Sequence, residues 1–115
     1  MHEVAIARDI LDLAEETARR EGARVIRTVA LRVGAMSGVV PEALTFAFEV
    51  AKAGTLAADA SLKVEWVPLA CYCRACDLEF EVDDPHGIAL CPRCRQPSAE
   101  VRRGRELAVR YLEVV

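Results

Sequence analysis

The sequence predicts an α+β fold of two helices and a three-stranded sheet, with a small zinc-ribbon module inserted into it. Two segments with helical periodicity and three segments with strand-like alternation predict the core. Two Cys-x-x-Cys pairs, which lie in a region poor in core-forming residues, predict the module. A chain of 115 residues has room for one such core and one small module.

Helices are expected over residues 4–21 and 41–53. The first ends before Gly22, and its apolar residues recur at helical spacing: Val4, Ala7, Leu11, Ala14 and Ala18. In the second, Pro41 suits the first helical position and Gly54 closes the segment. Its expected buried stripe is Leu44, Ala47, Phe48 and Ala51, widened by Phe46 and Val50.

Strands are expected over residues 24–33, 61–69 and 105–115. The last of these has apolar residues on both faces, a pattern typical of a buried and central strand. A short hairpin strand is expected at residues 78–82. The large aromatic residues are assigned to the core by default, namely Phe46, Phe48, Trp66 and Tyr111.

Residues 70–104 contain all five cysteines and three of the five prolines. Two thiolates three positions apart can reach one ion from a single turn, and a second pair completes a closed tetrahedral shell that suits structural zinc. The predicted zinc ligands are Cys73, Cys76, Cys91 and Cys94. So short a module needs the metal to fold. We therefore expect a discontinuous core, 1–69 and 105–115, and an inserted zinc-binding module, 70–104.

Two further residues in this module have competing interpretations. Cys71 could pair with Cys73 as an alternative ligand, but a one-residue gap bends less naturally around an ion, so a small apolar role is preferred. His86 lies in Asp83-Asp84-Pro85-His86-Gly87 and is interpreted as a turn residue. The alternative for His86 is a transient nickel or pH-sensing contact.

The chain begins Met1-His2-Glu3, directly before the first predicted helix. The amino group of Met1, the amide nitrogen of His2 and its imidazole can meet one ion, and Glu3 can add a fourth ligand. Such a planar, nitrogen-rich set favours Ni(II) or Cu(II). The alternative is that His2 is simply an exposed second residue and Glu3 a helix-start carboxylate. The motif is too short to decide between them.

Composition and motifs argue against several classes of protein. The net charge of −3 is unfavourable for a nucleic-acid-binding protein. No apolar run is long enough to span a membrane, and the start lacks the pattern of a secretory signal, so a cytoplasmic protein without membrane insertion is expected. A closed zinc shell cannot activate water, and no nucleophile–base pair or phosphate loop is evident, so no enzyme is expected.

The whole chain resembles the HypA/HybF family of hydrogenase maturation proteins, which are nickel metallochaperones. The matching features occur together and in order: Met1-His2-Glu3, Leu31-Arg-Val-Gly34-Ala-Met-Ser-Gly38-Val, the helix from Pro41 to Ala53, the two cysteine pairs, and the segment from Gly104 to Val115.

This resemblance implies that the amino-terminal stretch binds nickel, with His2 essential, and that the four cysteines hold a structural zinc. It implies delivery of nickel, with a partner GTPase, to the large-subunit precursor of a [NiFe]-hydrogenase, and in some bacteria service to urease and its accessory proteins. The alternative is a structural zinc-ribbon adaptor in metalloenzyme assembly that binds no nickel. A monomer and a dimer, including a domain-swapped one, are both compatible with the sequence.

Overall fold

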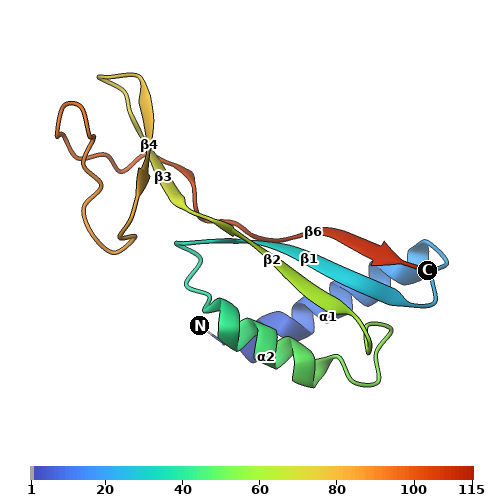
Figure 1. The fold of residues 1–115 in the computed structure, drawn as a ribbon. Coiled ribbons are helices and arrows are strands. Elements are labelled where there is room, and N and C mark those ends of the chain that lie inside the picture. Colours follow the sequence, from blue (N-terminus) through green and yellow to red (C-terminus); the bar gives the residue numbers. More distant parts are fainter. Residues whose placement is uncertain (1) are drawn as a thin grey trace. The chain divides into compact units, whose positions relative to one another are not determined.

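The computed structural model describes residues 2–115, and it contains two helices and six strands within them. In chain order they are α1 (Glu3–Arg20), β1 (Ile26–Gly34), α2 (Pro41–Ala51), β2 (Ser61–Val67), β3 (Leu69–Cys73), β4 (Leu78–Val82), β5 (Val101–Arg103) and β6 (Leu107–Val114). Figure 1 shows the strands forming two separate sheets, with orders β2-β1-β6 and β4-β3-β5. The predicted α+β fold, with two helices and a three-stranded sheet, is confirmed.

Both helices lie on one face of the β2-β1-β6 sheet and pack against each other (Figure 1). The core between helices and sheet contains buried side chains from each layer, including Leu11, Val29, Leu31, Leu44 and Phe48. The periodicity of α1 explains its burial, since Ala7, Ile10, Leu11, Ala14 and Ala18 form one stripe. Val4, the first residue of the stripe predicted from the sequence, is instead 58% exposed.

The prediction that residues 105–115 form a buried central strand is wrong. β6 lies at an edge of its sheet, beside β1, and most of its residues are exposed. Apolar residues on both faces indicate a central strand only when layers cover both faces. Here the two helices cover one face of the sheet, so many apolar side chains of β6 are exposed rather than buried.

The default assignment of the aromatic residues to the core is right only for Phe48, which is fully buried. Phe46 is 72% exposed, Trp66 48% and Tyr111 41%. The buried stripe of α2 is limited to Leu44, Ala47 and Phe48. Phe46 lies two positions from Phe48, and residues two apart on a helix do not share a face. For the same reason Val50 does not widen the stripe but is exposed.

The segment predicted as one strand over residues 61–69 is divided between the two sheets. β2 ends at Val67, and β3 begins at Leu69 and pairs antiparallel with β4 and β5. Close backbone approach near this point requires glycine. A Cβ atom at Gly104, whose φ is +118°, would lie 2.7 Å from Cα of Leu69.

The contacts divide the chain into two compact units. The first, here called the core unit, comprises Met1–Arg32, Val39–Glu65 and Ala108–Val115, and the second, the cysteine unit, comprises Val33–Gly38 and Trp66–Leu107. The predicted domains, residues 1–69 with 105–115 and residues 70–104, stay a prediction about which parts of the chain fold independently. Neither described helix is long and apolar enough to cross a membrane.

Candidate metal sites

Four cysteines of the cysteine unit come from two turns. Cys73 ends β3, and Cys76 lies in the turn that joins β3 to β4 and is closed by the pairing of Cys73 with Leu78. Cys91 and Cys94 lie in a second turn, in which the Arg95 amide donates to the Cys91 carbonyl at 2.9 Å. Each pair therefore presents its two sulfur atoms from one tight turn.

The two turns share an unusual backbone feature. The residue that follows each pair has a positive φ, +49° at Asp77 and +64° at Arg95. Within the described residues, these two are the non-glycine residues with a positive φ. A left-handed residue at this place reverses the chain directly after the second cysteine. The repeated conformation indicates that both turns are shaped for the same task, which is to direct two thiols toward one point.

The sulfur atoms fit one tetrahedral ion. All four Sγ atoms lie within 4.8 Å of one another, and those of Cys73 and Cys94 are 3.6 Å apart. A tetrahedral zinc with Zn–S bonds of about 2.3 Å requires Sγ–Sγ distances of about 3.8 Å. Cys73 and Cys91 are buried, whereas Cys76 and Cys94 are half-buried. The cluster could therefore hold zinc with no position left for a substrate.

The thiol pKa values differ sharply within the cluster. Backbone amides of Cys94 and Arg93 lower the pKa of Cys91 to about 6. Burial, followed by the neighbouring sulfur atoms, raises the pKa of Cys76 to about 12. Without a cation, a second thiolate beside the first is unfavourable. A dication reverses this balance, so metal binding and proton release are coupled at this cluster.

Cys71 lies outside the four-cysteine cluster. It is buried in the small core of the cysteine unit with Leu69, Phe80, Cys73 and Cys91, and it pairs with Phe80 across the β3–β4 ladder. Burial raises the pKa of its thiol. Its surroundings agree with the interpretation as a small apolar residue.

His86 lies in a turn, as its sequence context indicates. Its backbone amide donates to Asp84 Oδ1 at 2.9 Å, and the side chain is exposed. The described residues place no cluster of metal-ligating side chains around it. The exposed side chain of His86 and the hydrogen bond of its backbone to Asp84 both agree with a turn residue.

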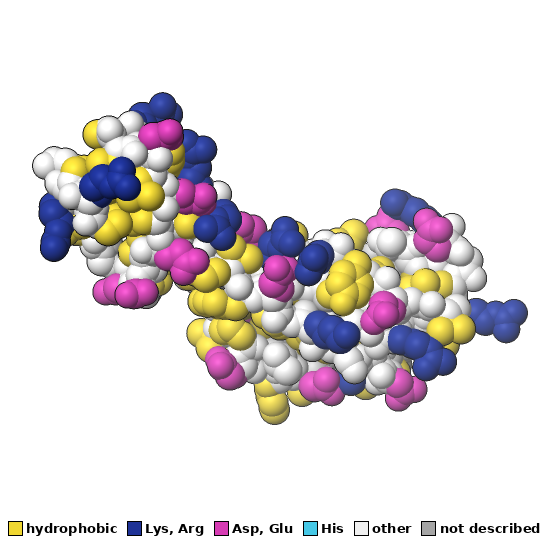
Figure 2. Space-filling model, turned by 45° about the horizontal axis from the view of Figure 1, so that its top comes forward, with side chains coloured by type: hydrophobic (Ala, Val, Ile, Leu, Met, Phe, Trp, Pro, Cys, Tyr) yellow, Lys and Arg dark blue, Asp and Glu magenta, His cyan; other side chains and the backbone are white. Residues whose placement is uncertain are grey.

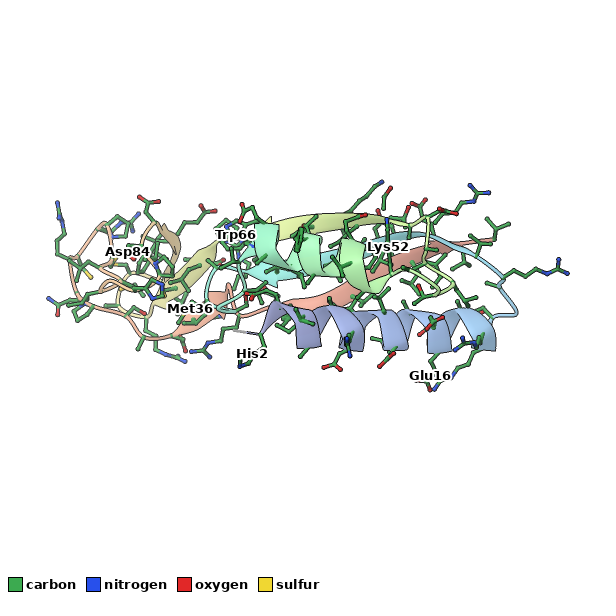
Figure 3. All side chains as sticks on the ribbon, turned by 90° about the horizontal axis from the view of Figure 1, so that it is seen from below. His2, Glu16, Met36, Lys52, Trp66 and Asp84 are labelled. Carbon is green, nitrogen blue, oxygen red and sulfur yellow. The ribbon has the colours of Figure 1, made fainter. Side chains whose placement is uncertain are left out.

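The amino-terminal motif lies at the start of α1, in the core unit. Figure 3 shows the His2 side chain directed away from the ribbon, and His2 is exposed. Its carbonyl accepts the first hydrogen bond of the helix from the Ile6 amide at 3.2 Å. The backbone of His2 is thus anchored while the imidazole is free to reach an ion. Met1, the third residue of the predicted nickel site, lies outside the described residues.

Glu3 makes a contact that the sequence did not reveal. Its Oε2 atom accepts from the backbone amide of Val40, the residue that precedes α2, at 3.2 Å. This hydrogen bond lowers the pKa of the Glu3 carboxyl. Val40 is the N-cap residue of α2 and makes no side-chain cap hydrogen bond, and the Glu3 carboxylate satisfies its backbone amide, which has no partner within the helix. One signal in the sequence could have indicated such a contact: the helix begins Val40-Pro41, without the Ser, Thr, Asp or Asn that usually caps a helix.

The basic residues near the end of the cysteine unit are engaged locally. Arg103 donates to Glu79 at 2.9 Å, and the guanidinium of Arg102 lies 4.1 Å from the ring centre of Tyr72. Figure 2 shows basic and acidic side chains interspersed on the face in view. This mixed pattern differs from the basic track expected of a nucleic-acid-binding surface.

Together, the fold and the cysteine cluster define a small α+β protein with a zinc-ribbon-like unit, and comparison with known proteins places it in a class of nickel metallochaperones. Residues 1–114 match the model of the family described as "Hydrogenase/urease nickel incorporation, metallochaperone, hypA". The chain belongs to this HypA family of hydrogenase maturation factors, as the resemblance in its sequence indicated.

Individual relatives support the assignment. The chain is 44% identical over 115 residues to hydrogenase maturation factor HypA of Picosynechococcus sp., covering 100% of both chains. It is 43% identical over 116 residues to the protein of the same name from Solidesulfovibrio magneticus, covering 99% of both. Among solved structures, it resembles the Ni metallochaperone HypA from Helicobacter pylori with a TM-score of 0.68 and 25% identity, over 100% of this chain and 98% of that one.

Proposed function

We propose that this protein binds one Ni(II) ion at its amino terminus and delivers it, with a partner GTPase, to the large-subunit precursor of a [NiFe]-hydrogenase. The proposed ligands are the amino group of Met1, the backbone and imidazole nitrogens of His2, and Glu3 in a direct or supporting role. The four clustered cysteines hold a structural zinc. We expect the protein to work in the cytoplasm and to catalyse no reaction itself.

The observation that carries the nickel proposal is the arrangement of His2 and Glu3. His2 is exposed and held by its carbonyl at the first turn of α1, and Glu3 is positioned by the Val40 amide. That hydrogen bond uses one carboxylate oxygen, and a carboxylate has a second that can face a metal. A nitrogen-rich set of this kind favours nickel over zinc, calcium or magnesium.

The exposure of the site suits a carrier better than a resident cofactor. A cargo ion must be reached by ligands of the receiving protein, so an open site at the chain terminus permits exchange. The cysteine cluster has the opposite character, with two of its ligands buried. We therefore assign the two metals to different tasks, one carried and one retained.

Nickel insertion provides the functional test. Purified hydrogenase precursor, the maturation GTPase and GTP are combined with this protein loaded with one equivalent of nickel, and the nickel content of the precursor is measured. We expect the wild type to support insertion and His2→Ala to reduce it to the level of free nickel. Equal delivery by both would contradict the assignment of His2, and service to urease can be tested with urease accessory proteins in the same assay.

The rival function is a structural adaptor that assembles the maturation proteins without carrying nickel. One observation favours the adaptor, because exposed apolar side chains often contact partner proteins. Such side chains here include Phe46, Val50 and Val4. An adaptor would still bind the precursor or the GTPase after His2→Ala, as the carrier would. The adaptor differs from the carrier in one result: with free nickel in solution, wild type and His2→Ala would support nickel insertion equally well.

A further inference from the structure

A groove of about 490 Å³ opens on the cysteine unit, and the proposed function leaves it unused. All of its lining residues belong to this unit, and none of them is one of the four clustered cysteines. Leu69 and Cys71 in its lining are buried in the small core of the unit, whereas Met36 is 42% exposed. The groove therefore leads from the surface into the apolar core of this unit.

Ile88 is the most exposed residue of this apolar lining. Its side chain is 79% exposed, the highest fraction among the large apolar side chains that the structure describes. Backbone hydrogen bonds anchor the chain on both sides of it. The Gly87 amide donates to the Asp84 carbonyl at 3.1 Å. The Ala89 carbonyl accepts from the Ser98 amide at 2.9 Å. An anchored loop thus presents Ile88 to solvent, and exposed apolar surface of this kind is typical of a contact site.

The polar side chains that line the groove are Ser98 and Arg105, and the first of them is already engaged. The Ser98 hydroxyl donates to the Tyr72 carbonyl and accepts from the Glu100 amide. Arg105 is exposed, and none of the ion pairs among the described residues involves its guanidinium. The charge of Arg105 is therefore available to a ligand of the groove.

The charge around Arg105 favours an anionic ligand with an apolar part. The neighbouring Arg103 pairs with Glu79 at 2.9 Å, and the carboxylate of Glu106 accepts from the Gly104 amide at 2.7 Å. No acidic side chain of the described chain lines the groove. A guanidinium beside an apolar groove selects a carboxylate, with which it can form two parallel hydrogen bonds. A polar metabolite fits less well, because its site needs several placed polar groups.

An extended segment suits the strand beside the groove. Val101 lines the groove from β5, which lies at an edge of the β4-β3-β5 sheet, and no described strand pairs with the other side of β5. A partner segment can add backbone hydrogen bonds at such an edge, while its alternate side chains enter a groove. Side chains two positions apart share one face of an extended chain. The fitting segment therefore has an aliphatic residue and a carboxylate two positions away.

We propose that this groove docks an extended segment of a partner protein, in which an aliphatic side chain packs beside Ile88 and a carboxylate two positions away pairs with Arg105. The segment is short, so its contact area is below that of stable complexes and the isolated segment binds weakly. No proposed nickel ligand takes part in this contact. Docking is therefore independent of the nickel site, and the failure of one assignment leaves the other standing.

Peptide titrations of the zinc-loaded full chain, followed by nitrogen–proton correlation NMR, test the proposal. The probe is a peptide with blocked ends and the central sequence Asp-Thr-Leu-Thr-Asp, whose two carboxylates serve either chain direction. Three matched peptides replace both aspartates by asparagine, both by lysine, or the leucine by serine. We expect saturable shifts of the Ile88 and Val101 amides with the first peptide. The other three should bind more weakly by roughly tenfold or more.

Charge reversal identifies the cation. Arg105→Glu should weaken binding of the aspartate peptide by roughly tenfold or more and should bind the lysine peptide instead, a gain that also shows the variant is folded. Ile88→Ser should weaken the aspartate peptide while its zinc content stays that of wild type. Arg27→Glu, a matched change at an exposed arginine of the core unit, should leave binding unchanged, and so should His2→Ala.

Several results would overturn the proposal. One is the absence of saturable shifts with the aspartate peptide, and another is a set of shifts that excludes Ile88 and Val101. Equal binding of the asparagine peptide would show that the carboxylate plays no part. An Arg105→Glu protein that does not exchange the aspartate for the lysine peptide would show the same for Arg105.

Discussion

At the scale of single residues, Glu3 connects the amino-terminal segment to the packing of the helices. Its carboxylate accepts from the Val40 amide at 3.2 Å and so caps α2 from the first turn of α1. The residue that we propose to contact nickel therefore also holds two helices in position. The sequence identified Glu3 as a candidate ligand or a helix-start carboxylate, but a contact across 37 positions depends on tertiary structure, which local patterns do not contain.

The two roles of Glu3 can be separated by substitution. Glu3→Gln retains an oxygen that accepts from the Val40 amide, whereas Glu3→Ala removes it. We expect thermal unfolding followed by helical circular dichroism to show the lowest Tm for Glu3→Ala and an intermediate Tm for Glu3→Gln, because the amide oxygen still accepts but carries no charge. Equal Tm values for all three proteins would show that the capping contact contributes nothing to stability.

The capping contribution of Glu3 should depend on pH. Because the fold lowers the pKa of this carboxyl, the contribution is fully present above the unfolded value of about 4.3 and is lost as pH falls through the lower folded value. The difference in Tm between wild type and Glu3→Ala should therefore be larger at neutral pH than in acid, where the neutral carboxyl group accepts more weakly. A difference that grows as the pH falls would contradict the direction of this pKa shift.

At the scale of elements, the sequence predicted where helices and strands lie better than which of their faces are covered. The helix periods and the glycine and proline boundaries located α1 and α2 to within a few residues. The errors at Tyr111 and Trp66 share one cause, whereas the error at Phe46 follows from its helical spacing, which puts it on a different face from Phe48. An apolar side chain is buried only if another element covers its face, and a single sequence does not state how many layers a sheet has.

The two phenylalanines of α2 provide a matched test of this distinction. Phe48 is fully buried between helices and sheet, whereas Phe46 is 72% exposed. Phe48→Ala should lower the free energy of unfolding by about 3–5 kcal/mol, because it leaves a cavity in the core. Phe46→Ala should change it by no more than about 0.5 kcal/mol. Urea unfolding followed at a helical wavelength measures both, and similar losses for the two variants would contradict the packing described here.

At the scale of the whole molecule, the chain consists of two units with separate cores, and both helices belong to the core unit. The core unit is built from conventional apolar packing. The cysteine unit has a small core in which Cys71, Cys73 and Cys91 accompany Leu69 and Phe80, so its apolar packing is limited. The spacing of the cysteines predicted their convergence, because each Cys-x-x-Cys turn presents two sulfur atoms and a four-coordinate zinc requires both pairs.

This division predicts a selective response to zinc removal. A strong chelator, or Cys73→Ser, should unfold the cysteine unit while the helical circular dichroism of the core unit persists. Hydrogen exchange should become fast in β3, β4 and β5 but remain slow in α1 and β1. Loss of helical signal together with the cysteine unit would show that the two units fold as one, and would contradict the independent module expected at residues 70–104.

The central claim is that the amino terminus of this chain binds the nickel that it carries. Its most direct test is a calorimetric and spectroscopic nickel titration of zinc-loaded protein with a native amino terminus. His2→Ala and a protein with one additional residue before Met1 are titrated beside it. We predict about one nickel per wild-type chain, with the absorption of a planar nitrogen-rich site, and strongly weakened binding in both altered proteins. Equal binding by all three, or no binding by the wild type, would contradict the claim and leave the structural adaptor as the better account.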